Sequence, residues 1–171
     1  LAINYEYIDE KALHPNGPTT VNGKRPAEEV RKEINGHGAG VIHIRKADGK
    51  WNVVKNSRYN RRFTSATPMS LAGPLRGTAS VRTPYSPNGT LVRGTNNNCG
   101  NGFTPWGTYL TAEENWYACF VNKTPAADRP KSQIRMEIPS TAGRYKWETA
   151  AGDATEVQGE FARFDITPTG A

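Results

Sequence analysis

A cysteine and two adjacent glutamates stand on either side of a turn-rich segment in the middle of the chain. Cys99 follows three asparagines, and Glu113 and Glu114 come 14 and 15 positions later. A thiolate together with carboxylates suits iron or another borderline cation, whereas carboxylate and amide oxygens suit calcium. The glycines between them would let the backbone fold closely around an ion. The residue types therefore predict a metal site formed by Cys99, Glu113 and Glu114.

The same residues also fit an ordinary structural role. Thr111 and Glu114 stand three positions apart, just before the apolar sequence NWYACF. This is the pattern of a capping box at the start of a helix. In this interpretation Cys99 is a small buried side chain and the asparagines form a turn. Spacing by itself does not decide between the two interpretations.

The composition favours a mainly β protein. Hydrophobic residues make up 36% of the 171 residues, and the mean hydropathy is −0.70. The 17 glycines and 12 prolines favour short strands and turns over long helices. No stretch reaches the ~18 consecutive apolar residues of a membrane span, so we expect no transmembrane segment. The sequence opens on LAINYEYIDEK, in which no signal peptide is visible, and this start does not decide the cellular location of the protein.

The chain is basic, with a net charge of +6 and a pI of about 9.4. Its lysines and arginines are spread along the sequence, and SRYNRRF (57–63) is the one dense basic and aromatic cluster. No known nucleic-acid-binding motif surrounds that cluster. We therefore expect no nucleic-acid partner and a basic surface that attracts small anionic substrates.

One helix is predicted over residues 26–36. Pro26 suits the first helical position, the following glutamates favour the positive helix start, and Asn35-Gly36 supplies a stop.

Hairpins account for most of the remaining pattern. Residues 40–46 and 50–56 alternate around an Asp-Gly turn, which predicts a β-hairpin. A second hairpin is expected to join 78–83 to 90–95, and residues 159–167 alternate like another strand. Residues 122–140 read as a long mobile loop. The fold class is thus mainly β, built from antiparallel hairpins with short helices, and the periodicity fits a sandwich or propeller blades.

The central segment resembles the signature of PhoX-type alkaline phosphatases. In that family an Asn-Asn-Cys run precedes Thr-Pro-Trp-Gly-Thr and Thr-x-Glu-Glu-Asn, and SRYNRRFTSATPMSLAGP and GRYKW are also similar to family sequences. In this chain the five segments are residues 97–99, 104–108, 111–115, 57–74 and 143–147. The resemblance therefore extends over about residues 37–147.

This resemblance implies a large β-propeller that hydrolyses phosphate monoesters with a cluster of iron and calcium ions on its axis. It implies that Cys99 ligates iron and that Glu113 and Glu114 belong to the metal shell. It identifies no catalytic or substrate-binding residue in this chain, and the scattered histidines, His14, His37 and His43, are expected to be structural. Family members are typically exported through the twin-arginine route, so a periplasmic or secreted location is implied.

The chain differs from the family in its length. PhoX-type enzymes are much longer, and their remaining ligands and phosphate-contacting arginine lie beyond the matched stretch. We therefore expect residues 1–171 to form part of a β-propeller domain that is inactive alone and can self-associate through open sheet edges. Two other functions stay open, namely a propeller scaffold or binding module and a calcium-dependent propeller hydrolase such as a lactonase, which needs no thiol ligand.

Two structural expectations follow from the motif. Cys119 lies outside it, so we predict that Cys99 does not form a disulfide with Cys119. The sequence TAEEN (111–115) should open a short helix or tight turn, with at least one glutamate directed toward the Cys99 loop.

Overall fold

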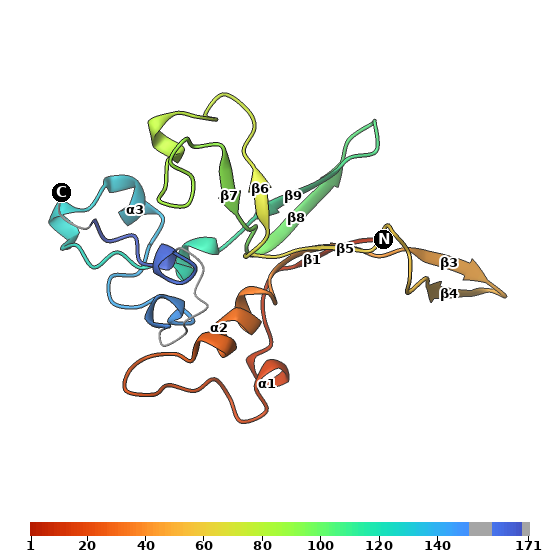
Figure 1. Ribbon diagram of the computed structural model, residues 1–171, viewed down its shortest axis with the longest axis horizontal. Coiled ribbons are helices and arrows are strands. Elements are labelled where there is room, and N and C mark those ends of the chain that lie inside the picture. The colour runs from red at the N-terminus through yellow and green to blue at the C-terminus, as the bar shows by residue number, and fades with distance from the viewer. Residues whose placement is uncertain (151–158, 169–171) are drawn as a thin grey trace.

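Short antiparallel strands provide the framework of the protein, as a computed structural model shows (Figure 1). The structure describes residues 1–150 and 159–168. One sheet has three strands in the order β1-β2-β5, and three hairpin-like pairs, β3-β4, β6-β7 and β8-β9, stand beside it. The strands are β1 (Ala2–Tyr5), β2 (Gly38–Val41), β3 (Ile44–Ala47), β4 (Lys50–Val53), β5 (Arg61–Phe63), β6 (Pro68–Ser70), β7 (Leu91–Arg93), β8 (Asn98–Phe103) and β9 (Tyr109–Glu113).

The helices are few and short. The α-helices are α1 (Glu10–Leu13), α2 (Ala27–Ile34) and α3 (Lys131–Arg135), and the 3-10 turns are η1 (Ala79–Val81), η2 (Trp116–Cys119), η3 (Ala126–Asp128), η4 (Trp147–Thr149) and η5 (Ala162–Phe164). A mainly β chain with antiparallel sheets is therefore confirmed, although the described residues close no propeller. None of the described helices is long and apolar enough to cross a membrane.

Helix α2 forms where the sequence predicted it. Pro26 occupies the N-cap, one position before the helix begins, and the backbone N–H of Asn35 closes the last turn onto Arg31 and Glu33. The helix buries Val30 and Ile34, four residues apart on one face. This face belongs to the same buried cluster as Cys119, Trp147 and Phe164.

The first predicted hairpin is confirmed around its turn, although its strands are shorter than predicted because residues 40 and 41 belong to β2. Strands β3 and β4 pair in the register Ala47↔Lys50, and Asp48 and Gly49 have the positive φ angles, 50° and 75°, that the tight turn requires. The hairpin extends away from the rest of the molecule (Figure 1).

The second predicted hairpin is wrong. Residues 79–81 form η1, and β7 pairs instead with β6, in the register Met69↔Val92. Ser86 gives the physical reason, because its buried hydroxyl accepts the backbone N–H groups of Thr90 and Leu91. This local bonding folds the intervening loop on itself and leaves no partner strand for β7 within it.

The predicted C-terminal strand and the long loop also differ from expectation. Residues 159–167 contain η5, because Phe161 and Phe164 are both buried and a helical turn brings residues three apart onto one side. A single parallel bridge, Val121↔Asp165, is the β pairing found for this segment among the described residues. The 122–140 region includes η3 and α3.

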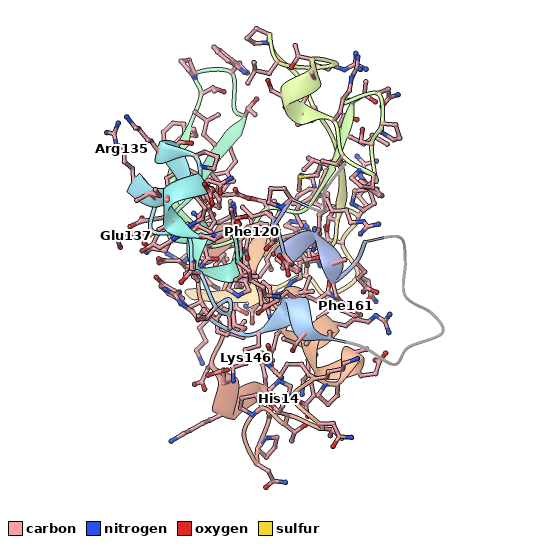
Figure 2. All side chains as sticks on the ribbon, turned by 90° about the vertical axis from the view of Figure 1, so that its left-hand side faces the viewer. His14, Phe120, Arg135, Glu137, Lys146 and Phe161 are labelled. Carbon is pink, nitrogen blue, oxygen red and sulfur yellow. The ribbon has the colours of Figure 1, made fainter. Side chains whose placement is uncertain are left out.

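Aromatic rings from the end of the chain fill the core. Trp147 stacks on Tyr145 with centroids 5.0 Å apart and meets Phe164 edge-on at 4.9 Å. Phe161 is buried in the same cluster, and the partly buried Phe120 packs against it (both labelled in Figure 2). The core therefore joins helix α2 to segments more than 80 residues further along the chain.

A buried carboxylate lies beside these rings. Glu33 is fully buried, and its carboxylate accepts bonds from Arg25, from His14 Nε2 at 2.8 Å and from Trp147 Nε1 at 2.8 Å. A buried charge is tolerated only when it is paired and hydrogen-bonded. Glu33 therefore requires its three partners to be in place.

We predict that Glu33→Ala lowers the free energy of unfolding by about 3–5 kcal/mol, because it removes the buried carboxylate that pairs with Arg25 and accepts the Trp147 indole N–H. Glu28→Ala is the matched control on the same helix, since Glu28 is exposed and pairs with Arg31 at the surface. The control should change stability by less than about 0.5 kcal/mol. Denaturant unfolding measures both, and equal effects for the two variants would contradict this role of Glu33.

Candidate metal site

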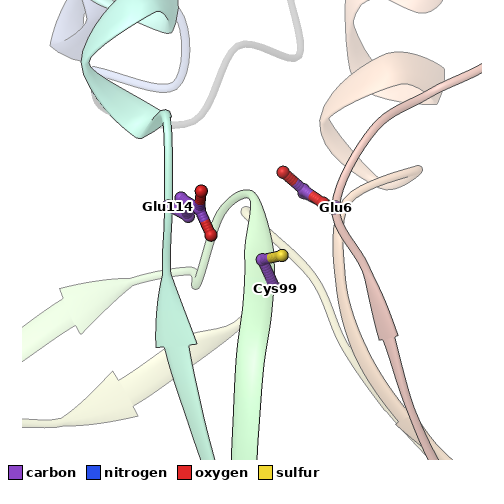
Figure 3. Close-up of side chains that lie close together, drawn as sticks. All are labelled: Glu6, Cys99 and Glu114. Carbon is purple, nitrogen blue, oxygen red and sulfur yellow. The ribbon is translucent and has the colours of Figure 1, made fainter.

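Glu6, Cys99 and Glu114 converge on one point (Figure 3). One ligand atom from each, the thiol sulfur and two carboxylate oxygens, lies within 4.8 Å of the others. Glu6 directly follows β1, Cys99 is the second residue of β8, and Glu114 directly follows β9. Three segments far apart in the sequence thus supply one group of potential metal ligands.

Asn4 fixes the distance between β1 and the β8-β9 hairpin. Its amide Nδ2 donates to the carbonyl oxygen of Cys99 at 2.8 Å, and its Oδ1 accepts from the hydroxyls of Tyr109 and Thr111 at 3.0 and 2.9 Å. One side chain therefore holds both strands of the hairpin. Since Glu6 lies two positions from Asn4, on the same side of an extended strand, it is brought next to Cys99.

Two asparagines in the left-handed conformation place Glu114. Asn97 and Asn115 have φ angles of 50° and 56°, which Asn tolerates better than most residues. The carbonyl of Asn97 accepts the backbone N–H of Glu114 at 2.9 Å, and the amide of Asn115 donates to the hydroxyl of Tyr7 at 2.8 Å. The chain on both sides of the site is thereby tied together.

The structure brings Glu114 to Cys99 but places Glu113 elsewhere. Glu113 is the last residue of β9, and its carboxylate accepts the backbone N–H of Asn96 at 2.7 Å. Consecutive residues of an extended strand point to opposite sides, so adjacent glutamates cannot both face one sulfur there. Sequence reasoning had paired Cys99 with both glutamates and had missed Glu6.

The capping-box interpretation is wrong. Thr111 lies within β9, where its hydroxyl accepts from the amide of Asn98 at 3.0 Å and donates to Asn4. The helical turn η2 begins only at Trp116, after the left-handed Asn115, and has no side-chain cap. The prediction that TAEEN (111–115) opens a helix or tight turn is therefore wrong for its first three residues, whereas the predicted approach of one glutamate, Glu114, to Cys99 is confirmed.

The second cysteine has a different environment. Both thiols are free, as predicted, and Cys119 is buried in the core. Its sulfur donates to Asn97 Oδ1 at 3.6 Å, and burial raises the pKa of the Cys119 thiol to about 11. Cys119 thus supports the asparagine that positions Glu114.

The histidines lie outside the ligand group. His37 is fully buried and its Nδ1 donates to the backbone carbonyl of Glu6 at 2.8 Å, while burial lowers the pKa of the imidazole. His14, labelled in Figure 2, bonds Glu33, and His43 bonds Ser57. His37 therefore holds the segment that carries Glu6, a role that the sequence did not reveal.

Negative charge accumulates at Cys99. Hydrogen bonding of the thiol to Glu6 and Glu114, and repulsion by their charges, raise the pKa of Cys99 to about 12. Two carboxylates and a thiol without a neighbouring cation are electrostatically unfavourable when the thiol ionises. A bound metal ion would reverse this balance and stabilise the thiolate. The donor chemistry and the charge of the group therefore both fit a cation.

We predict that the Cys99 thiol of metal-free protein reacts slowly with iodoacetamide at pH 8, because a pKa of about 12 leaves roughly one thiolate in ten thousand. Replacing both carboxylates, Glu6→Gln and Glu114→Gln, should lower this pKa and speed alkylation at least ten-fold. The rates are measured in a Cys119→Ser background. An unchanged rate would show that the carboxylates do not control the thiol.

Comparison with known proteins shows the family of the chain. The model of the family described as alkaline phosphatase PhoX matches residues 1–170. The solved structure of Pseudomonas fluorescens PhoX in complex with vanadate, a transition state analogue, matches with a TM-score of 0.81 and 34% identity. That match covers 96% of this chain and 26% of the other, so the chain spans about a quarter of the length of the solved relative. No curated protein matched. The chain belongs to the PhoX alkaline phosphatase family.

Proposed function

We propose that this chain contributes part of the metal centre of an enzyme that hydrolyses phosphate monoesters. The observation that carries the proposal is the convergence of Glu6, Cys99 and Glu114 in a member of the PhoX family. The solved PhoX structure holds vanadate, a transition state analogue, and this supports phosphoryl chemistry for the family.

The ligand group suits iron better than calcium. A thiolate is a soft ligand that calcium does not favour, whereas iron accepts sulfur and carboxylate oxygen together. We propose that Cys99, Glu6 and Glu114 hold iron and that calcium binds at neighbouring positions where oxygen ligands predominate. When bound, such cations neutralise phosphate oxygens and orient the ester for attack.

The residues of this chain have separate tasks in the proposed site. Cys99, Glu6 and Glu114 bind the ion, and Asn4 keeps β1 and β8 at the distance that the ligand set requires. His37, whose pKa is lowered by burial, donates a hydrogen bond to the backbone carbonyl of Glu6. Second-layer contacts of this kind tune metal affinity because they fix the direction of each ligand.

Exposed apolar side chains suggest what surrounds the site. Phe103 and Trp106, at the end of the β8-β9 hairpin, are 83% and 78% exposed. We propose that such surfaces pack against further parts of a PhoX fold, and that the short antiparallel sheets belong to blades of a β-propeller. When uncovered, they favour self-association. We also propose the exported, periplasmic or secreted location that is typical of the family.

Metal binding tests the ligand assignment residue by residue. We expect Cys99→Ser, Glu6→Gln and Glu114→Gln each to weaken iron binding at least ten-fold, because each removes one of three ligands. Glu113→Gln is the matched control, since this neighbouring carboxylate bonds the backbone of Asn96 instead. Competition with a calibrated chelator measures the affinities. If Glu113→Gln and Glu114→Gln weakened iron binding equally, the assignment of Glu114 rather than Glu113 as the ligand would be overturned.

Activity tests whether the site is complete. We predict that the 171-residue chain hydrolyses p-nitrophenyl phosphate at no more than the rate of the Cys99→Ser variant, even with iron and calcium supplied. A cluster needs several ions with full ligand shells, and three ligands do not fill them. A PhoX polypeptide of full family length serves as the positive control. Comparable turnover by both would show that these residues suffice.

A further inference from the structure

Positive charge is concentrated in one part of the chain. Residues 41–112 contain ten lysines and arginines and a single acidic residue, Asp48, which gives this stretch a net charge of +9. The rest of the chain has twelve basic and fifteen acidic residues. Every ion pair found among the described residues lies outside residues 41–112. Lys55 and Arg62 take part in none of these ion pairs, so their charges are available to a ligand.

Three of these cations line one groove. Lys55, Arg61 and Arg62 border a groove of about 480 Å³ between the β1-β2-β5 sheet and the end of β4. Tyr5 and Val53 contribute aromatic and apolar surface, and no acidic residue lines it. A groove with this lining is suited to an anion attached to an apolar or aromatic body.

Arg62 is positioned before any ligand arrives. Its guanidinium lies 4.6 Å above the ring of Tyr5, and its Nη2 donates to the carbonyls of Asn35 and Gly36 at 2.8 and 3.1 Å. No described residue accepts a bond from its Nε or Nη1. The guanidinium of Arg62 is thus held in place by its neighbours while its Nε and Nη1 donors stay available to a ligand. A guanidinium held in this way suits the oxygens of phosphate or carboxylate.

The loop that carries Lys55 is also held in place. The amide of Asn60 donates to the carbonyls of Val54 and Lys55 at 3.0 and 2.9 Å, and its oxygen accepts the backbone N–H of His43 at 2.8 Å. Gly40 provides room at the base of the groove, since a Cβ there would lie 2.9 Å from the hydroxyl of Tyr5. A glycine at this register position lets the tyrosine lie flat over the sheet.

The groove is separate from the proposed metal centre. Arg62 pairs with Gly40, whereas Asn4 pairs with the next residue, Ala39. Side chains at adjacent register positions point to opposite faces of a sheet. Tyr5 and Arg62 therefore lie on one face, and Asn4, which holds the Cys99 strand, on the other. The lining also lacks the thiol and carboxylates of the metal group.

From these observations we propose that the groove is a second ligand site that binds an organic phosphate, with Lys55 and Arg62 contacting the phosphate and Tyr5 and Val53 contacting its apolar body. The site binds this ligand without hydrolysing it, since no histidine, carboxylate, serine or cysteine among the described residues lines the groove. It goes beyond the proposed hydrolysis and does not depend on metal.

The test uses phenylphosphonate, whose phosphorus–carbon bond resists hydrolysis, with metal-free protein in EDTA. Titration calorimetry gives the affinity, and amide NMR shifts locate the ligand. We expect shifts at Val41, Ile42, Val53 and Asn60, and weaker binding at high salt because the contacts are exposed. Methylphosphonate should bind several-fold more weakly because it lacks the aromatic body. Equal affinity for both probes would overturn the role of the apolar wall.

Two pairs of substitutions distinguish a specific site in the groove from general electrostatic attraction to the basic surface. Lys55→Gln/Arg62→Gln should weaken binding at least ten-fold, because charge-assisted hydrogen bonds are lost. Arg76→Gln/Arg82→Gln removes the same charge from the same basic stretch but outside the groove, and it should bind like the parent chain. Equal weakening by both pairs, or no binding by the parent chain at 10 mM ligand (roughly the weakest useful affinity), would overturn the proposal.

Two further variants complete the design. Among the described residues, no hydrogen bond or ion pair involves the side chain of Lys55, so Lys55→Gln alone should not disturb the fold. This variant is informative even if the loss of Arg62 affects folding. It should weaken binding of phenylphosphonate several-fold. Cys99→Ser should bind phenylphosphonate unchanged while losing iron. Loss of both properties in Cys99→Ser would mean that the probe binds at the metal centre, which contradicts a second site without disproving the proposed hydrolysis.

Discussion

The buried carboxylate of Glu33 joins parts of the chain that would otherwise not meet. It accepts bonds from Arg25, His14 and Trp147, and Trp147 lies 114 residues away. The edge contact of Trp147 with His37, at 5.4 Å, continues the connection, and His37 donates to the backbone of Glu6. The core is therefore linked physically to the metal ligands. Since an unpaired buried charge is so unfavourable, this arrangement strongly favours one packing of the core over alternatives.

The ligand group itself depends on strand geometry. Alternation along an extended chain places Asn4 and Glu6 on one side and separates Glu114 from Glu113. The left-handed Asn97 and Asn115 then set the direction of the chain on both sides of the thiol. Polar side chains thus do most of the positioning, because Asn4, Asn97 and Asn115 offer donors and acceptors on short, stiff stems.

Local signals predicted local structure and missed long-range contacts. Helix α2 and the β3-β4 hairpin were predictable because a helix stop and an Asp-Gly turn act on neighbouring residues. The pairing of β6 with β7 was not, since the buried Ser86 decides it through bonds within the loop. Cys99 and Glu114 were identified from the motif. Glu6 had no such signal, because its approach to Cys99 depends on a contact by Asn4 across 95 residues.

The charge around Cys99 has a consequence for metal uptake. With a pKa of about 12, the thiol is protonated at neutral pH, so binding of a cation must release that proton. Affinity then rises with pH, by about ten-fold per unit while the free thiol stays protonated and the carboxylates ionised. The two carboxylates that oppose ionisation of the free thiol are also ligands to the ion that favours it. The same three side chains therefore keep the unloaded thiol unreactive and bind the ion as a thiolate once it is present.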